Sequence, residues 1–187
     1  MKQWYTVNPS LLQQEKALMA QHFPQFSLEK SENGNLYWLG ELSIDNKQII
    51  EKPKKYTVCA VYANIYPQAR MDYPIRVYPV IPDVGEMQEK YGRASLNFRP
   101  DENPYGYGSQ ILMDSASNFY VATLKEDKMN NYSAVKELRF FECWLQLCLC
   151  VGAMRLEAPA MQISWKSLTA RYKHLENYIS KRIYGKI

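Results

Sequence analysis

The chain has 187 residues, of which 47% are hydrophobic and 13% aromatic, so it is long and apolar enough to fold around its own core. Its net charge of +4 comes from 23 basic and 19 acidic residues dispersed along the sequence, which argues against a nucleic-acid-binding protein. The sequence shows no signal-peptide pattern and no apolar run of about 18 residues, so we expect a cytoplasmic protein that is not inserted in a membrane.

The four cysteines and two histidines limit the chemistry available to the chain. Neither a Cys-x-x-Cys pair nor a set of cysteines and histidines with zinc-ligand spacing is present, so we expect no metal site and no cofactor. Cys143, Cys148 and Cys150 fall in one apolar segment with helical spacing, where burial raises the pKa of a thiol. We therefore interpret these three as unreactive structural thiols.

Residues 9–23 predict the first helix. Asn8 is a typical N-cap and Pro9 a typical first helical residue, and apolar side chains then recur at intervals of three and four until Pro24 ends the pattern. His22 falls on the apolar side of this helix. We interpret it as a packed or rim side chain and not as a ligand.

Residues 26–44 predict a β-hairpin. Asn33-Gly34 is a strong signal for a tight turn between a short run at 26–29 and a longer run at 36–44. The longer run is rich in apolar and aromatic residues, as expected of a half-buried strand. Gly40 interrupts this run, and we expect it to mark a β-bulge.

Two further strands are predicted over 56–65 and 75–81, where Val, Ile, Tyr and Thr predominate. Pro67 and Pro74 bound the connection between them, because each fixes φ and lacks an amide donor. For the same reason we expect Pro79 to lie at a sheet edge or a bulge. Together with the hairpin, these runs predict an antiparallel four-stranded meander.

The remainder predicts a long irregular segment and two helices. Regular periodicity is lost over 83–117, and an apolar island at 118–124 then predicts a brief extended segment on the core. Ser133 is a candidate N-cap for the next helix, whose apolar face recurs at intervals of three and four until Gly152, its expected end. A last helix is predicted over 162–184.

The fold class predicted is therefore α+β, with an N-terminal helix, a four-stranded antiparallel meander, a long irregular segment and two C-terminal helices. We expect residues 1–158 to form one α+β domain and residues 159–187 to supply a C-terminal helix packed on it. The last helix carries an apolar stripe that could pack either on this domain or on a second copy of the chain.

Three stretches resemble a known family. Trp38–Leu42 is followed by Lys55–Pro82, and within the latter Tyr73–Pro79 resembles a pattern of Tyr-Pro, aliphatic, Pro and aliphatic residues. Phe141–Leu145 resembles an aromatic-rich helix that follows the active site in a bacterial branch. With the order of elements, these stretches resemble the ubiquitin-conjugating enzymes and their bacterial relatives in antiviral conjugation operons.

The resemblance implies a protein that binds a ubiquitin-like protein, its activating enzyme, or both, with no cofactor. In that family a cysteine after the meander accepts the modifier's C-terminus as a thioester, and a nearby asparagine stabilises the oxyanion. Ala122 stands where the resemblance places this cysteine, Val121 is nearly as good a match, and residues 83–142 contain no cysteine at all. Asn118 is then the candidate oxyanion donor, and Asp127 or Glu126 the candidate to deprotonate an incoming amine.

Alanine offers no nucleophile, so thioester chemistry at Ala122 is excluded in the chain as given. Two interpretations remain open at this point. The protein is either a naturally degenerate member that binds partners without catalysis, or a form in which alanine replaces a native cysteine. A different class is also open, namely a non-catalytic structural or interaction domain that forms homo-oligomers through its last helix.

Overall fold

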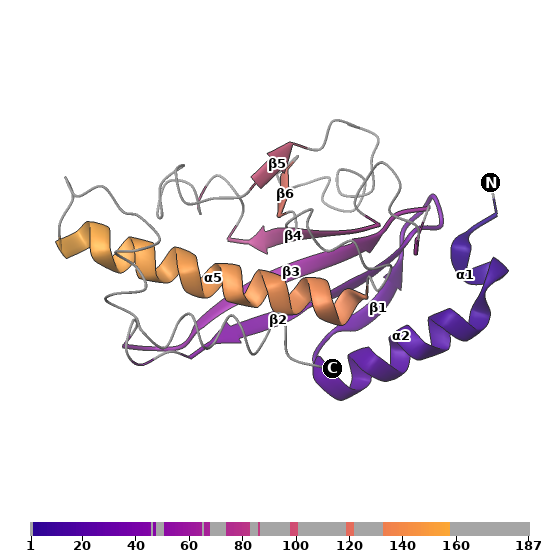
Figure 1. Ribbon diagram of the computed structural model, residues 1–187, viewed down its shortest axis with the longest axis horizontal. Helices are drawn as coiled ribbons and strands as arrows, with labels where there is room; N and C mark the ends of the chain where they lie inside the picture. Colours follow the sequence, from indigo (N-terminus) through magenta and orange to yellow (C-terminus); the bar gives the residue numbers. More distant parts are fainter. Residues whose placement is uncertain are drawn as a thin grey trace.

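The computed structural model is an α+β protein with an N-terminal helix, an antiparallel sheet and a C-terminal helix. The sheet lies at the centre, with the long C-terminal helix across it and the N-terminal helices toward one end (Figure 1). The structure describes residues 2–45, 47, 51–64, 66–67, 74–82, 86, 98–100, 119–121 and 133–157.

The chain begins with a short helix, α1 (Trp4–Val7), and a longer helix, α2 (Pro9–His22). Asn8 caps α2 as predicted, because its side-chain oxygen accepts the amide hydrogen of Leu11 at 3.2 Å. Pro9 occupies the first helical position, where its missing amide donor costs nothing. The first predicted helix is thus confirmed in position and capping.

The predicted hairpin is formed by β1 (Ser27–Lys30) and β2 (Leu36–Ile44), which pair antiparallel. Gly34 in the turn has φ of +87°, a left-handed conformation that glycine adopts without a steric penalty. The amide of Gly34 donates to the carbonyl of Ser31 at 2.9 Å and closes the turn. The tight turn predicted from Asn33-Gly34 is therefore present.

Two more strands, β3 (Lys54–Tyr62) and β4 (Ile75–Ile81), complete the antiparallel meander β1-β2-β3-β4. Beyond β4 the sheet continues with β6 (Phe119–Val121) and then β5 (Phe98–Pro100). Strand β6 confirms the brief extended segment predicted there. Strand β5 corrects the prediction that regularity is absent over 83–117, because three residues ending in proline are too few to show a strand period.

The bulge lies in β4 and not at Gly40. Gly40 pairs with Val58 in a continuous register, so the predicted bulge at this glycine is wrong. Its role is to admit Phe26, since a Cβ at position 40 would lie 2.5 Å from that ring. The register shifts instead where Thr57 pairs with Ile81 and Val58 with Pro79, which confirms that Pro79 lies at a bulge.

The long helix α5 (Ala134–Glu157) runs across one face of the sheet (Figure 1). Ser133 caps it as predicted, with its hydroxyl accepting the amide hydrogen of Lys136 at 3.2 Å. The predicted end at Gly152 is wrong, because the strong helix formers that follow this glycine carry the helix on to Glu157. No helix in the described part of the chain is both long and apolar enough to cross a membrane.

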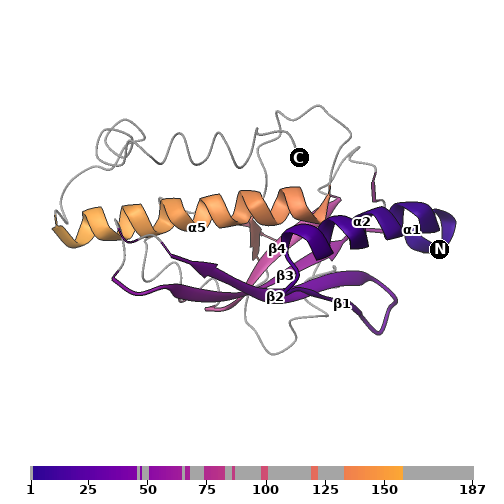
Figure 2. The same cartoon turned by 90° about the horizontal axis from the view of Figure 1, so that it is seen from below.

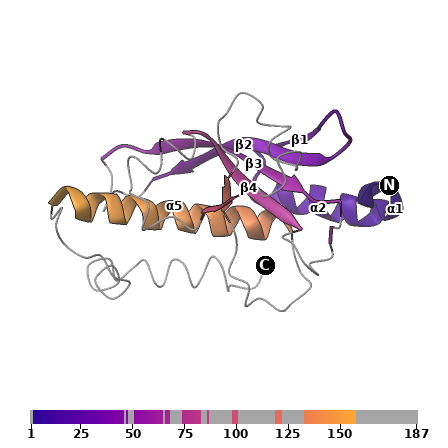
Figure 3. The same ribbon diagram turned by 90° about the horizontal axis from the view of Figure 1, so that it is seen from above.

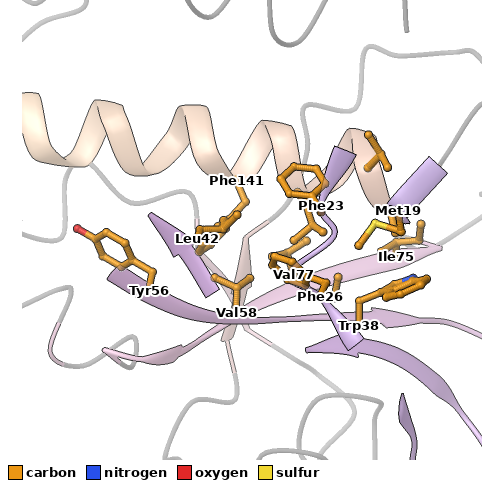
Figure 4. Packing of buried hydrophobic residues seen from close by; sticks show 14 of the residues in the cluster. Met19, Phe23, Phe26, Trp38, Leu42, Tyr56, Val58, Ile75, Val77 and Phe141 are labelled. Atoms are coloured by element: carbon orange, nitrogen blue, oxygen red, sulfur yellow. The ribbon is translucent and has the colours of Figure 1, made fainter. Parts of the chain in front are cut away.

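Helices α2 and α5 lie on the same side of the sheet, as the views from below and from above show (Figures 2 and 3). Side chains from both helices and from the strands fill the space between them (Figure 4). The predicted apolar face of α5 is confirmed over most of its length, since these of its residues are buried: Val135, Leu138, Phe141, Trp144, Leu145 and Cys148.

The opposite face of the sheet carries a second, smaller apolar cluster. Cys59, Val61 and Tyr78 are fully buried in it, and Tyr37 and Leu39 of β2 pack against them. Strands β3 and β4 are thus apolar on both faces, which explains why they form nearly continuous apolar runs and do not alternate strictly.

Candidate functional site

A buried carboxylate lies where α2, the sheet and α5 meet. Glu15 of α2 is only 2% exposed. One of its oxygens accepts the Tyr62 hydroxyl at 2.6 Å and the amide hydrogen of Ala134 at 3.0 Å, and the other accepts the Tyr66 hydroxyl at 2.8 Å. Hydrogen bonds to a charged acceptor are stronger than neutral ones, so this carboxylate joins three separate segments.

Each partner is delivered by a different element. Tyr62 ends β3, Tyr66 lies in the turn that follows it, and Ala134 is the first residue of α5. A carboxylate at a helix N-terminus also interacts favourably with the helix dipole. Trp38 of β2 extends the network, because its indole N–H donates to the Tyr62 hydroxyl at 2.9 Å. We call Glu15, Trp38, Tyr62, Tyr66 and the Ala134 amide the Glu15 cluster.

The electrostatics of the Glu15 cluster keep both tyrosines protonated. Burial raises the pKa of Tyr62 well above its ordinary value, and the negative charge of Glu15 raises it further. Burial and the charge of Glu15 raise the pKa of Tyr66 in the same direction. Both hydroxyls therefore act as hydrogen-bond donors to the carboxylate at any physiological pH.

Trp4 covers the Glu15 cluster from the N-terminal side. Its ring centroid lies 5.0 Å from that of Tyr62 and 4.7 Å from that of Tyr66, and the two tyrosine rings are 4.8 Å apart. Such tilted and edge-on contacts are favourable aromatic geometries. Glu15 itself is buried, so its carboxylate is not open to a substrate and holds α2 to β3 and α5.

Because Glu15 holds α2 to the sheet and to α5, the side of α2 that faces solvent is presented on a firmly held helix. Glu15 and Met19 point inward and are buried. Lys16 is the exposed cation of this helix, and the helix's one acidic residue, Glu15, is buried. The other exposed residues of α2 are small or uncharged, namely Pro9, Ser10, Gln13, Gln14, Ala17, Ala20 and Gln21.

His22, at the end of α2, is a rim side chain as predicted. It is half-buried, and its Nδ1 lies 2.9 Å from a guanidinium nitrogen of Arg139 on α5, so the neutral imidazole accepts this hydrogen bond. Burial and the positive charge of Arg139 both lower the pKa of His22. The pair adds a second link between α2 and α5.

All four cysteines of the chain are free and buried. Burial raises the pKa of Cys150 to about 12 and that of Cys148 well above its ordinary value, with Cys150 adding to the latter shift. Burial also raises the pKa of Cys59. The interpretation of Cys143, Cys148 and Cys150 as structural thiols agrees with this burial, and the chain as given presents no accessible thiolate.

The site residues predicted from the resemblance, Ala122, Asn118 and Asp127, lie outside the described residues. Strand β6 ends at Val121, immediately before Ala122 in sequence, and pairs with β4 through Val77. The last predicted helix, 162–184, and the predicted unit 159–187 also lie outside the described residues. In the part of the chain that is described, no group of acidic, cysteine or histidine side chains could hold a metal ion.

The Glu15 cluster was not predicted from the sequence, although a signal for it exists. Glu15 stands in the apolar stripe of α2, four residues after Leu11 and four before Met19. A carboxylate at such a position faces the core and requires buried donors. Its donors are the hydroxyls of Tyr62 and Tyr66 and the amide of Ala134, all far along the chain, so only the fold brings them to Glu15.

Comparisons with family models, with curated proteins and with solved structures gave no match for this chain.

Proposed function

We propose that this protein is a ubiquitin-conjugating-like module that binds a ubiquitin-like protein, its activating enzyme, or both, and that it is catalytically inactive as given. The observation that carries the proposal is the order of elements: an N-terminal helix, a four-stranded antiparallel meander with a Tyr-Pro turn after β3, and a helix across one face. The sequence patterns described above support the same family.

The outer side of α2 is the surface proposed to bind the activating enzyme. The helix is fixed to the sheet and to α5 through Glu15, so its exposed side chains are presented on a rigid element. Lys16 gives this side a positive charge that no exposed acid of α2 offsets. The complementary partner surface is therefore acidic.

The absence of catalysis follows from the thiols. Each of the four cysteines is buried, and the position assigned to the nucleophile holds alanine. Thioester formation requires a thiolate that the modifier's C-terminus can reach. The proposed role of the chain as given is therefore to bind and position partners.

Binding tests the proposal directly. Purified protein is titrated by calorimetry with the ubiquitin-like and activating proteins encoded beside its gene. We expect association with at least one of them, and an about tenfold loss of affinity for the activating enzyme in Lys16→Glu. The matched control is Lys52→Glu, an equal charge reversal at an exposed residue just before β3, at the end of that strand away from α2. The absence of any association would refute the proposal.

A second experiment separates a natural binding module from an inactivated enzyme. Ala122→Cys is incubated with the activating enzyme, ATP and the ubiquitin-like protein. If alanine replaces a native nucleophile, a covalent adduct forms that thiol reagents cleave. The unaltered chain is the control and forms no adduct, because its own thiols are buried. No adduct with Ala122→Cys, despite measurable binding, identifies the module as non-catalytic by nature.

A further inference from the structure

In the described part of the chain, helix α1 is held to the rest of the protein mainly by its aromatic side chains and two hydrogen bonds. It has four residues, too few to be stable alone, and Trp4 is its one buried residue. The Tyr5 hydroxyl donates to the carbonyl of Gly34 at 2.9 Å, and the Gln3 side chain donates to the carbonyl of Asn33 at 3.3 Å. Val7 is 68% exposed. Among the described residues, docking of α1 therefore rests on the side chains of Trp4 and Tyr5 and on the turn at 31–35.

Two buried polar atoms in or beside the docked helix have no partner among the described residues. One is the indole nitrogen of Trp4, which is 6% exposed, and the other is the side-chain oxygen of Asn35, which is 4% exposed. Asn35 belongs to the same turn that Tyr5 and Gln3 contact. A buried donor and a buried acceptor that are both unpaired oppose docking, because each regains hydrogen bonds to water on release.

We propose that α1 is a detachable strap. In the docked state Trp4 seals the Glu15 cluster, and in the released state water reaches the carboxylate and competes for the hydroxyls of Tyr62 and Tyr66. Because Glu15 belongs to α2 and accepts the first amide of α5, release of Trp4 loosens both helices at that point. The strap thus sets how firmly α2 is held. Its effect on partner binding rests on the proposed function, whereas its effect on α2 does not.

Hydrogen exchange of the full chain, with no partner present, tests this proposal. For Trp4→Ala we expect amides of α2 and of the first turn of α5 to exchange about tenfold faster or more, and amides of β3 less than about threefold faster. Val7→Ala truncates an exposed side chain of the same helix and is the matched control. We expect it to leave amide exchange unchanged in α2, in α5 and in β3. Equal acceleration in β3 and α2 would show that Trp4 is an ordinary core residue and would overturn the proposal.

A second variant is expected to favour the docked state, so the test does not rely only on a variant that destabilises the protein. Asn35→Leu replaces the unpaired buried acceptor with an apolar group of similar size. We expect it to slow exchange in α2 about threefold, because the docked state is then favoured. Tyr5→Phe, which loses the hydrogen bond to the carbonyl of Gly34, is expected to speed amide exchange in α2. Unchanged or faster exchange in Asn35→Leu would contradict the strap.

Discussion

Two buried regions flank the N-terminal half of α5, and they are built on different principles. Beneath the helix, Leu138 and Phe141 belong to the same buried apolar cluster as Val58, where the shape and volume of the side chains decide the packing. At its first turn, the Glu15 cluster places a carboxylate of α2 among donors from β3, the turn after β3 and the first amide of α5. An apolar core tolerates side chains of similar volume, whereas a buried carboxylate tolerates no loss of a partner.

The comparison also shows how the two regions divide their roles. The apolar core makes the sheet and α5 one body, and its contacts are non-directional. The Glu15 cluster is directional and fixes the position of α2, the helix proposed to bind a partner. The following substitutions test this division.

The largest effect is expected from Glu15→Ala. It leaves two hydroxyls and the Ala134 amide buried without their acceptor, so the free energy of unfolding should fall by about 3–5 kcal/mol. Urea denaturation measures this loss. Lys16→Ala, one residue further on the exposed side, should change stability by less than about 0.5 kcal/mol. Near-equal effects of the two substitutions would contradict the role of Glu15.

The next substitution probes the apolar region. Leu138→Ala leaves a cavity in the core and should cost about 2–5 kcal/mol, whereas Leu138→Met conserves volume and should cost less than about 1.5 kcal/mol. In the Glu15 cluster the equally conservative Glu15→Gln replaces an acceptor oxygen by a donor and should cost about 1–3 kcal/mol. Thermal or urea unfolding measures the loss of stability in the three variants. If Glu15→Gln were as stable as the original chain, the Glu15 cluster would tolerate a conservative substitution as well as the apolar core does.

A smaller effect is expected at Gly40, on the margin of the apolar core. In Gly40→Ala the new Cβ meets the Phe26 ring, and the resulting displacement should cost about 1–3 kcal/mol. Phe26→Leu presents a smaller side chain to the same strand. The double variant should therefore lose less free energy of unfolding than the two single variants lose together. Additive losses would show that the close contact between position 40 and Phe26 is unimportant.

The smallest effect concerns the exposed edge of the α2–α5 contact. Burial and the charge of Arg139 lower the pKa of His22 below its ordinary 6.5, so the folded state favours the neutral ring. Its contribution to stability is present above pH 6.5 and is lost as the pH falls through the lowered pKa. An NMR titration should give a midpoint below 6.5, and Arg139→Gln should move it upward. A midpoint that Arg139→Gln leaves unchanged would contradict the pairing.

Local patterns predicted much of the fold because the physics behind them is local. Asn8 and Ser133 cap helices, Gly34 makes the turn and Pro79 lies at a bulge, each as its own chemistry requires. The errors at Gly40 and Gly152 have different causes. Gly40 leaves room for the Phe26 ring, a contact that the local sequence does not show, and Gly152 is followed by helix formers that continue α5.

The Glu15 cluster could not be predicted in the same way, because its members are separated by up to 119 residues between Glu15 and Ala134. Periodicity places Glu15 on the inward side of α2 but does not say which donors it meets. The predicted site at Ala122, Asn118 and Asp127 stays a prediction, since it rests on a resemblance and lies outside the described residues.

A double-mutant cycle between Glu15 and Tyr62 tests most directly the claim that this carboxylate holds α2 to the sheet. The free energy of unfolding is measured for Glu15→Leu, Tyr62→Phe, the double variant and the original chain. The bond from Trp38 to the Tyr62 hydroxyl is lost in both backgrounds and cancels. The account predicts a coupling energy of about 1–3 kcal/mol between the two side chains. Additive losses, within about 0.5 kcal/mol, would contradict it.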